Sequence, residues 1–276
     1  MVVEDVAGSA GTFVRSLNAL RSELGLPPHT SPRIAAETSH LLETDPGGSW
    51  VAVANGRVLG FAQAAMRDEL WVLAHLFVEP DAQNQSLGRN LLNRAFAYGS
   101  TAKAGIISSS PGARAITAYS RLPGFEVHPS VTAEGALRRA GLRVASGVRD
   151  GVSGDVEFAA DVDRRLRGGA HGPDLDFFLR EGDEFLVLPD RGYALAGPSG
   201  PSVVAALDVE AASQLLIECL ARTTSDDISI KRMAGGHQWA ISCAVEAGLV
   251  LRPWGPIVCW NCSAPRTAYL QDSAFC

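Results

Sequence analysis

Apolar and polar positions follow two different periods along the first part of the chain. Large apolar residues three and four positions apart predict a helix over residues 10–26, and a similar pattern predicts a second helix over residues 32–42. Two apolar runs flank Asn55-Gly56, the favoured two-residue turn, and predict a β-hairpin. Residues 70–78 are apolar throughout, which is typical of a strand that is buried on both faces.

The pattern continues with a polar turn and a helix. We predict helices over residues 90–98 and 113–121, a strand over residues 105–108, and a further strand that begins at Gly124. The predicted order is two helices, an antiparallel meander, a strand–loop–helix and a strand–helix–strand. This order indicates an α+β fold. In such a fold a mixed central sheet is flanked by helices.

The same order of elements begins again in the second half of the chain. Strands are predicted at residues 184–188, 192–195, 202–207, 227–230 and 248–251, and helices at residues 209–221 and 237–247. Residues 132–155 are polar and rich in glycine and arginine, and we interpret them as a linker with one helical turn around residues 134–142. The repeat predicts two tandem domains of one fold, residues 1–131 and 156–276.

The segment that joins the strand at residues 70–78 to the next helix has the pattern of an anion-binding loop. The strand ends in Leu76-Phe77-Val78, a proline follows at position 80, and a short polar turn with one glycine leads into the helix. Such an arrangement points free backbone N–H groups, at the positive end of a helix, toward the space beyond the strand. Phosphates bind at such places, so the sequence predicts a phosphate-bearing cofactor.

The spacing within this segment resembles a known signature. Gln83-x-x-Ser86-x-Gly88 is similar to the acetyl-CoA signature of the GNAT acyltransferases, Gln/Arg-x-x-Gly-x-Gly/Ala. The resemblance implies that the loop amides hold the pyrophosphate of acetyl-CoA, and that the backbone of Leu76, Phe77 and Val78 binds the pantetheine arm and the acetyl carbonyl. The loop residues so assigned are Gln83, Asn84, Gln85, Ser86, Leu87, Gly88 and Arg89.

Two loop positions depart from the family pattern, since Asn84 and Ser86 stand where glycine is common. Asparagine tolerates unusual backbone angles, and serine is small enough for a phosphate to approach. We therefore still expect acetyl-CoA as the co-substrate.

The second copy lacks this loop. Between Leu207 and the next helix it has only Asp208-Val209-Glu210, and acidic side chains at a helix entrance repel a pyrophosphate. We predict that residues 156–276 are a degenerate GNAT-like domain, which completes the fold and shapes the acceptor pocket. The first domain, residues 1–131, would then hold the one acetyl-CoA site of a tandem protein.

Two residues are candidates for proton transfer. The resemblance places Tyr119, shortly before Gly124-Phe125, where the family has the tyrosine that protonates the CoA thiolate, with packing at a helix end as the alternative. His75, next to the strand residues that should hold the acetyl group, could accept the proton of the amine directly or through water. A hydrogen-bonded core histidine is an equally good interpretation of His75, and Glu79 and Glu69 are weaker candidates for the base.

Composition narrows the class of protein. The chain has 276 residues, 46% hydrophobic and 20% charged, which is typical of a core-forming protein of one large or two small domains. The net charge of −6 and the lack of a basic stripe argue against a nucleic-acid partner. No run of apolar residues is long enough for a membrane span and no signal peptide is visible, so we expect a cytoplasmic protein without a membrane partner.

Cys259 and Cys262 have CxxC spacing, but no second pair and no nearby histidine completes a zinc site, and we expect the five cysteines to be buried, reduced thiols. Acetyl transfer from a thioester to an amine needs a neutral amine, donors for the developing oxyanion and an acid for the thiolate. We therefore predict an acetyl-CoA-dependent N-acetyltransferase that acts by direct transfer in a ternary complex.

The acceptor would be a primary amine of a small polar molecule. By analogy with tandem members of the family, an aminoglycoside-like antibiotic is one such molecule, and the role would then be antibiotic resistance. The alternatives are a protein or peptide amine as acceptor, and a non-catalytic acyl-CoA sensor. The sequence leaves the acyl chain and the oligomeric state open, with a homodimer among the options.

Overall fold

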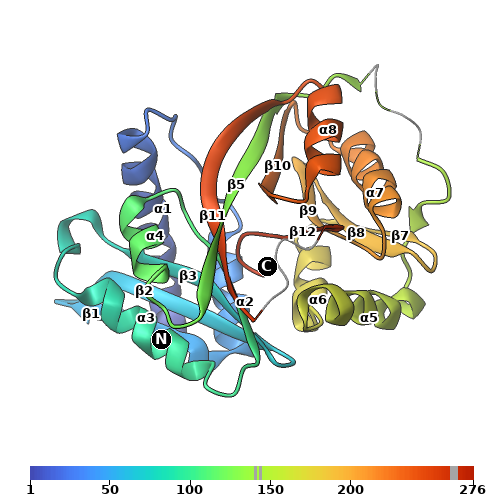
Figure 1. The fold of residues 1–276 in the computed structure, drawn as a ribbon. Helices are drawn as coiled ribbons and strands as arrows, with labels where there is room; N and C mark the ends of the chain where they lie inside the picture. The colour runs from blue at the N-terminus through green and yellow to red at the C-terminus, as the bar shows by residue number, and fades with distance from the viewer. Residues whose placement is uncertain (140–141, 143–144, 262–266) are drawn as a thin grey trace. The chain divides into compact units, whose positions relative to one another are not determined.

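The computed structural model describes residues 1–139, 142, 145–261 and 267–276 (Figure 1). It divides into two compact units, Met1–Gly105 and Ile106–Cys276. Strand β4 (Ala104–Ser108) contains the boundary. No helix in the described part of the chain is both long and apolar enough to cross a membrane.

Unit 1 consists of an antiparallel meander and three helices. Its elements are α1 (Val6–Glu23), α2 (Ile34–Thr44), β1 (Ser49–Ala54), β2 (Arg57–Arg67), β3 (Leu70–Val78) and α3 (Leu87–Tyr98), with short 3₁₀ turns at Val3–Asp5, Pro46–Gly48 and Pro80–Ala82. β2 pairs with both β1 and β3, and Asn55 at the β1–β2 turn has a φ of 51°. The predicted hairpin and the strand at residues 70–78 are therefore confirmed.

A β-bulge in β3 changes which face of the sheet its side chains reach. Gln63 pairs with His75 and Ala64 with Leu73, so Ala74 is the extra residue. Residues four apart on a regular strand share a face. Here Trp71 donates from its indole to the Ala95 carbonyl of α3 at 3.0 Å, whereas His75 packs against the ring of Phe13 in α1. The bulge turns His75 away from α3 and toward α1 and α2.

Unit 2 holds more strands and a larger core. Its elements after β4 are α4 (Ala113–Tyr119), β5 (Phe125–Ala136), β6 (Arg149–Asp150), α5 (Val156–Arg167), α6 (Pro173–Arg180), β7 (Glu184–Leu188), β8 (Gly192–Gly197), β9 (Gly200–Ala206), α7 (Val209–Arg222), β10 (Asp227–Ala234), α8 (Gln238–Glu246), β11 (Val250–Trp260) and β12 (Tyr269–Leu270), with a 3₁₀ turn at Ser153–Asp155. One sheet has the order β12-β9-β8-β7-β6, and β5 pairs with β11 on one side and β10 on the other. Apolar residues of α7, α8 and these strands form a buried core.

The repeat read from the sequence is present in the structure. The order α1, α2, β1, β2, β3, α3, β4, α4, β5 returns as α5, α6, β7, β8, β9, α7, β10, α8, β11. The protein therefore has the predicted mixed α/β fold, with sheets flanked by helices in two copies (Figure 1).

The range interpreted as a linker is only partly a connection. Residues 132–136 continue β5, where Ala133 is fully buried and pairs with Ile230 of β10. The sequence did not predict this part of the strand, because residues 132–136 include polar residues and a glycine and have no continuous apolar run. Part of the expected helical turn around residues 134–142 lies outside the described residues, and Glu134–Ala136 are strand. The division of the chain into domains at 1–131 and 156–276 stays a prediction, since the compact units meet at Gly105.

Candidate acetyl-CoA site

The predicted phosphate loop occupies residues 79–86, between β3 and α3. Asn84 and Ser86 both have left-handed backbones, with φ values of 67° and 62°. This is the conformation that glycine adopts most easily, and asparagine is the commonest other choice. The two departures from the family pattern therefore keep a glycine-like backbone at both positions.

The first turn of α3 carries donors that the protein does not use. The backbone N–H groups of Leu87, Gly88 and Arg89 have no hydrogen-bond partner among the described residues, and Ser86 makes no side-chain cap. The turn contains no acidic residue, and the Arg89 guanidinium donates to Ser86 Oγ at 3.2 Å. These donors, the helix dipole and a cation together suit a phosphate.

Gly88 leaves room at this helix start. A Cβ atom built at Gly88 would meet its nearest neighbour, Val78 Cγ2, at 3.6 Å, an ordinary contact, and the φ of Gly88 is not positive. Neither the backbone nor the packing of the protein requires glycine here. A ligand that approaches the backbone closely would require glycine at this position. The residues present therefore fit a bound pyrophosphate.

A buried ion pair fixes the start of the loop. Glu79 is 1% exposed, and its Oε1 accepts from Thr12 Oγ1 and from Arg15 Nη2, each at 2.6 Å. Burial acts to raise the pKa of Glu79, but the hydrogen bonds from Arg15 and Thr12 and the charges of Arg15 and Arg57 outweigh it, and the pKa is lowered. Glu79 is therefore an ionised anchor between α1 and the loop, which makes it a poor base.

Two donors hold the end of β3 at a single carbonyl. The oxygen of Val78 accepts from Ser16 Oγ of α1 at 2.7 Å and from Gln83 Nε2 at 3.2 Å. Gln83, the first residue of the signature, thus closes the loop back onto the strand through its side chain. Leu76, Phe77 and Val78 lie in β3 as expected, and their predicted contacts with pantetheine and the acetyl group stay a prediction.

His75 is buried in unit 1, with 3% of its surface exposed. Its Nδ1 lies 3.1 Å from Gln63 Oε1 and its Nε2 lies 3.5 Å from Glu37 Oε2. Aromatic rings of Phe13, Phe61 and Phe77 surround it at centroid distances of 5.9, 5.7 and 6.3 Å. Both interpretations of His75 therefore have support, because it is a hydrogen-bonded core residue that also faces a carboxylate.

Tyr119 is the last residue of α4, in unit 2. Its side chain is buried, and this burial raises the pKa of the phenol, which is protonated at neutral pH. Gly112 is the N-cap of α4, the position where the family has a helix-opening asparagine. The role of Tyr119 as the acid stays a prediction.

Glu69, the other weak candidate for the base, is exposed and pairs with Lys103 at 2.6 Å, outside this arrangement.

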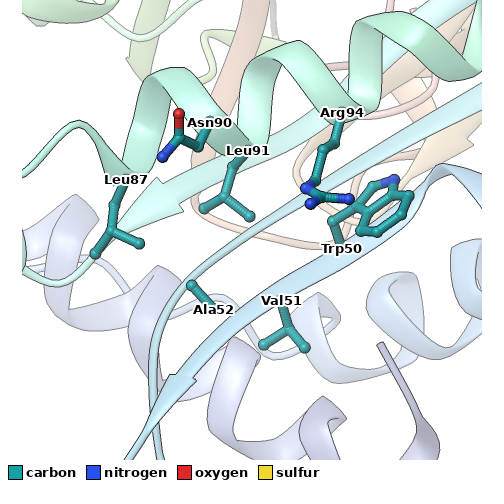
Figure 2. A pocket seen from close by; sticks show the side chains of 7 residues that line it. All are labelled: Trp50, Val51, Ala52, Leu87, Asn90, Leu91 and Arg94. Carbon is teal, nitrogen blue, oxygen red and sulfur yellow. The ribbon is translucent and has the colours of Figure 1, made fainter.

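A pocket of about 320 Å³ lies beside the loop helix, between β1 and one stripe of α3 (Figure 2). Its walls are Trp50, Val51, Ala52, Leu87, Asn90, Leu91 and Arg94. The Arg94 guanidinium lies 4.7 Å from the centre of the Trp50 ring, a cation–π contact. Leu87 is the one residue that this pocket shares with the predicted cofactor residues, so the pocket is not the phosphate loop itself.

The equivalent helix start in the second copy is already occupied by the protein. Asp208 is the N-cap of α7 and its Oδ1 accepts from the Ala211 N–H at 2.9 Å. Arg191 donates to both oxygens of Asp208, at 3.0 and 2.6 Å. These hydrogen bonds, from Arg191 first, lower the pKa of Asp208 and keep it charged. A pyrophosphate would meet a carboxylate in place of free N–H groups.

Sequence reasoning missed the polar partners of the site in unit 1. Glu37, Gln63 and Arg15 were not singled out, although Gln63 stands alone as a polar residue within the apolar run of β2 and is fully buried. A buried polar side chain in a strand needs a partner, which was the available signal. Glu37 and Arg15 lie on ordinary amphipathic helices and carry no such signal.

Comparisons with known proteins agree with the geometry. A model of the Acetyltransferase (GNAT) family matches residues 15–125, a range that contains both the β3–α3 loop and Tyr119. No curated protein sequence matches the chain.

Solved structures match the whole chain. A putative acetyltransferase from Pyrococcus horikoshii has a TM-score of 0.79 at 13% identity, and the match covers 100% of this chain and 93% of that one. A tandem GNAT protein from the clavulanic acid biosynthesis pathway has a TM-score of 0.59 at 15% identity, with 94% and 96% covered. A GCN5-related N-acetyltransferase from Sphaerobacter thermophilus has a TM-score of 0.58 at 14% identity, with 94% and 93% covered.

At such identities these structures show the fold alone, and the family match is confined to residues 15–125. Residues 15–125 thus match the model of the GNAT family of acetyltransferases, and the chain has the fold of solved acetyltransferases, a tandem GNAT protein among them.

Proposed function

We propose that this protein transfers the acetyl group of acetyl-CoA, the donor of its family, to a primary amine of a small polar molecule. The observation that carries the proposal is the start of α3, where the N–H groups of Leu87, Gly88 and Arg89 have no partner among the described residues. Acetyl-CoA supplies an acetyl group that is already activated as a thioester. The chain therefore needs no covalent nucleophile of its own.

Residues 83–89 would hold the pyrophosphate, and the backbone of Leu76–Val78 would orient the pantetheine arm and the acetyl carbonyl. Gln83 supports this role from within the loop, since its bond to the Val78 carbonyl ties the two parts together. The second copy adds no second cofactor site, because Asp208 caps α7.

A cationic acceptor suits the charge of the protein. The net charge is −6, and the Glu37 carboxylate stays 24% exposed beside His75. An ammonium group is attracted to such a carboxylate, and polycations such as aminoglycosides are one class with suitable amines. Electrostatic attraction does not distinguish these from other polyamines, so the acceptor has to be found by experiment.

Proton transfer falls to His75 on the amine and to Tyr119 on the thiolate. A neutral imidazole can take up the ammonium proton through an intervening group, and a protonated phenol can donate to the leaving sulfur. The raised pKa of Tyr119 keeps its proton in place until the thiolate forms.

An amine panel with acetyl-CoA, read by the release of free CoA thiol, tests the function. The panel should contain aminoglycosides, linear polyamines, amino acids, and peptides with a free N-terminus or a lysine. We expect turnover with at least one small polycationic amine and little with the peptides. Turnover with peptides alone would favour a protein acetyltransferase. CoA binding without any turnover would favour a sensor.

Tyr119→Phe tests the acid. We expect kcat to fall about 100-fold with the Kd for CoA unchanged, the usual effect of losing a general acid. Tyr98→Phe is the matched control, because the Tyr98 hydroxyl bonds Asp45 at the far end of α3 and should not affect turnover. Unchanged turnover in Tyr119→Phe would show that another group is the acid.

A further inference from the structure

The amide of Gln63 fixes the protonation of His75. Gln63 Nε2 donates to the Thr38 carbonyl at 2.9 Å and to Ser49 Oγ at 3.1 Å, so both amide hydrogens have acceptors. Gln63 Oε1, which can only accept, therefore faces His75 Nδ1 at 3.1 Å. His75 must carry a proton on Nδ1, and Nε2 is the nitrogen that gains or loses one.

Nε2 has one polar neighbour among the contacts described for His75, the Glu37 carboxylate at 3.5 Å. This distance is longer than the 2.7–2.9 Å typical of a charge-assisted hydrogen bond. The remaining contacts are the rings of Phe13, Phe61 and Phe77. Glu37 is the polar group described beside Nε2 that also reaches solvent.

Burial separates the roles of the two residues. The His75 side chain is 3% exposed, whereas that of Glu37 is 24% exposed. A soluble amine can touch Glu37 but not the imidazole. Two cations on the neighbouring elements already have carboxylate partners: Arg15 of α1 bonds Glu79 at 2.6 Å, and Arg67 of β2 bonds Asp45 at 2.8 Å.

We infer that Glu37, His75 and Gln63 form a proton relay in which Glu37 is the residue that touches the acceptor ammonium. This inference rests on the proposed function. The N–H bond of the ammonium breaks and its proton moves to the Glu37 carboxylate, which leaves a neutral amine. The proton then passes from Glu37 to His75 Nε2, which leaves Glu37 ionised and His75 an imidazolium. Gln63 is a positioning residue, which acts by holding the proton on Nδ1.

The relay explains why a bulge lies beside His75. Without Ala74 as the extra residue, His75 would share the face of Trp71 and point at α3, away from Glu37. The bulge places the imidazole on the side of α2 and leaves the last residues of β3 free to lead into the phosphate loop.

The tautomer is measured first and needs no acceptor. Nitrogen-15 NMR of the wild-type protein, with His75→Asn to assign the signal among the six histidines, reports which ring nitrogen carries hydrogen. We expect hydrogen on Nδ1 and a bare Nε2 at neutral to basic pH, and a mixture of tautomers in Gln63→Leu. Hydrogen on Nε2 in the neutral wild-type imidazole would overturn the relay.

Kinetics then test Glu37, with the best amine of the panel above as acceptor. We expect Glu37→Gln to lower kcat/KM at pH 7 about 100-fold, the usual size for a general base. The deficit should shrink as the pH approaches the pKa of the amine, because neutral amine then comes from solution. A merely structural role of Glu37 would leave the deficit constant across pH.

Glu43→Gln is the matched control, with the same charge change at an exposed position of α2. Equal rates in Glu37→Gln and Glu43→Gln would overturn the relay while acetylation itself stands. A panel in which no amine is acetylated would overturn the proposed function instead, so the two failures are distinguishable.

Discussion

The starts of α3 and α7 occupy the same place in the two copies of the fold, but only one is open. Each helix follows the third strand of an antiparallel meander. Residues 79–86 connect β3 to α3, whereas only Leu207 and Asp208 connect β9 to α7. At α7 the Asp208 carboxylate satisfies the Ala211 N–H. At α3 the N–H groups of the first turn have no partner among the described residues.

On the proposed function, the difference means that a helix dipole alone does not make a phosphate site. Both helices have a positive end, but α7 neutralises its own with Asp208 and adds Glu210 in the first turn. The longer loop before α3 carries two left-handed residues, Asn84 and Ser86, which turn the backbone without placing an acidic side chain at the helix start. We therefore expect ligand binding to depend on whether the connection leaves these N–H donors unused.

Making α3 resemble α7 gives the largest expected effect. Ser86→Asp adds a negative charge beside the open N–H groups, at a backbone conformation that aspartate tolerates. We expect the Kd for CoA to rise about 100-fold, equivalent to about 2.7 kcal/mol, with no loss of stability. Isothermal titration calorimetry at low and high salt measures this, and the penalty should shrink as salt screens the charge.

Ser86→Asn is the matched control for this change. It keeps the shape of aspartate and tolerates the same left-handed backbone but adds no charge. We expect CoA affinity close to that of the wild type. Equal losses in both variants would mean that size, rather than charge, distinguishes the two helix starts.

Gly88→Ala separates stability from binding at the same helix. The new methyl group has room against Val78 Cγ2, and alanine replaces glycine in a helix, so the free energy of unfolding should rise by about 0.5–1 kcal/mol. The methyl group also lies where a phosphate would approach, and we expect about a tenfold weaker Kd for CoA, or about 1.4 kcal/mol. Thermal unfolding and calorimetry measure the two effects on one sample.

Gly154→Ala is a control for this pair of measurements, because a Cβ at Gly154 meets no atom within 4 Å and the residue belongs to the 3₁₀ turn Ser153–Asp155 rather than to the first turn of α3 or α7. It should leave CoA binding unchanged. A Gly88→Ala protein that binds CoA as well as the wild type would remove Gly88 from the site.

The fold was predictable because each element has a local signal. The strands at Leu70–Val78 and Glu184–Leu188 have the bounds predicted from their apolar runs, and the helix start at Val209 follows from Asp208. The end of β5 was not predictable, because two of its three buried residues, Ser130 and Thr132, are polar and its partners β10 and β11 lie more than 90 residues later in sequence.

The site was predictable only along the backbone. The loop and its left-handed residues follow from a spacing of seven consecutive positions, Gln83 to Arg89. The side of the sheet on which His75 lies was not predictable. The extra residue Ala74 moves the His75 side chain to the opposite face of the strand, and the apolar pattern of the sequence does not reveal such a bulge. Its partners Glu37 and Gln63 come from other elements, and only the folded chain shows which helix covers that face.

Removing the N-cap of α7 gives the smallest expected effect. It tests whether an uncapped helix start is sufficient to bind CoA. Asp208→Ala removes the N-cap, and we expect the free energy of unfolding to fall by about 0.5–1 kcal/mol, the low end for a cap because the carboxylate is half exposed. For a chain of this length the melting temperature should fall by about 2 °C. The folded-state pKa of Asp208 is lowered from 3.8, so the charged cap stabilises above that pH and the stabilisation is lost as the pH falls below it.

The unfolding curve of the wild type should therefore approach that of Asp208→Asn in acid, because a protonated carboxyl and an amide both keep an accepting oxygen without the charge. Asp208→Asn should differ from Asp208→Ala by the same amount at every pH. The Kd for CoA should not change in either variant. Removing the cap frees the Ala211 N–H but leaves Glu210 and a connection too short to present further amides. A second equivalent of CoA bound by Asp208→Ala would show instead that an uncapped helix start is sufficient, and that the loop before α3 adds nothing essential.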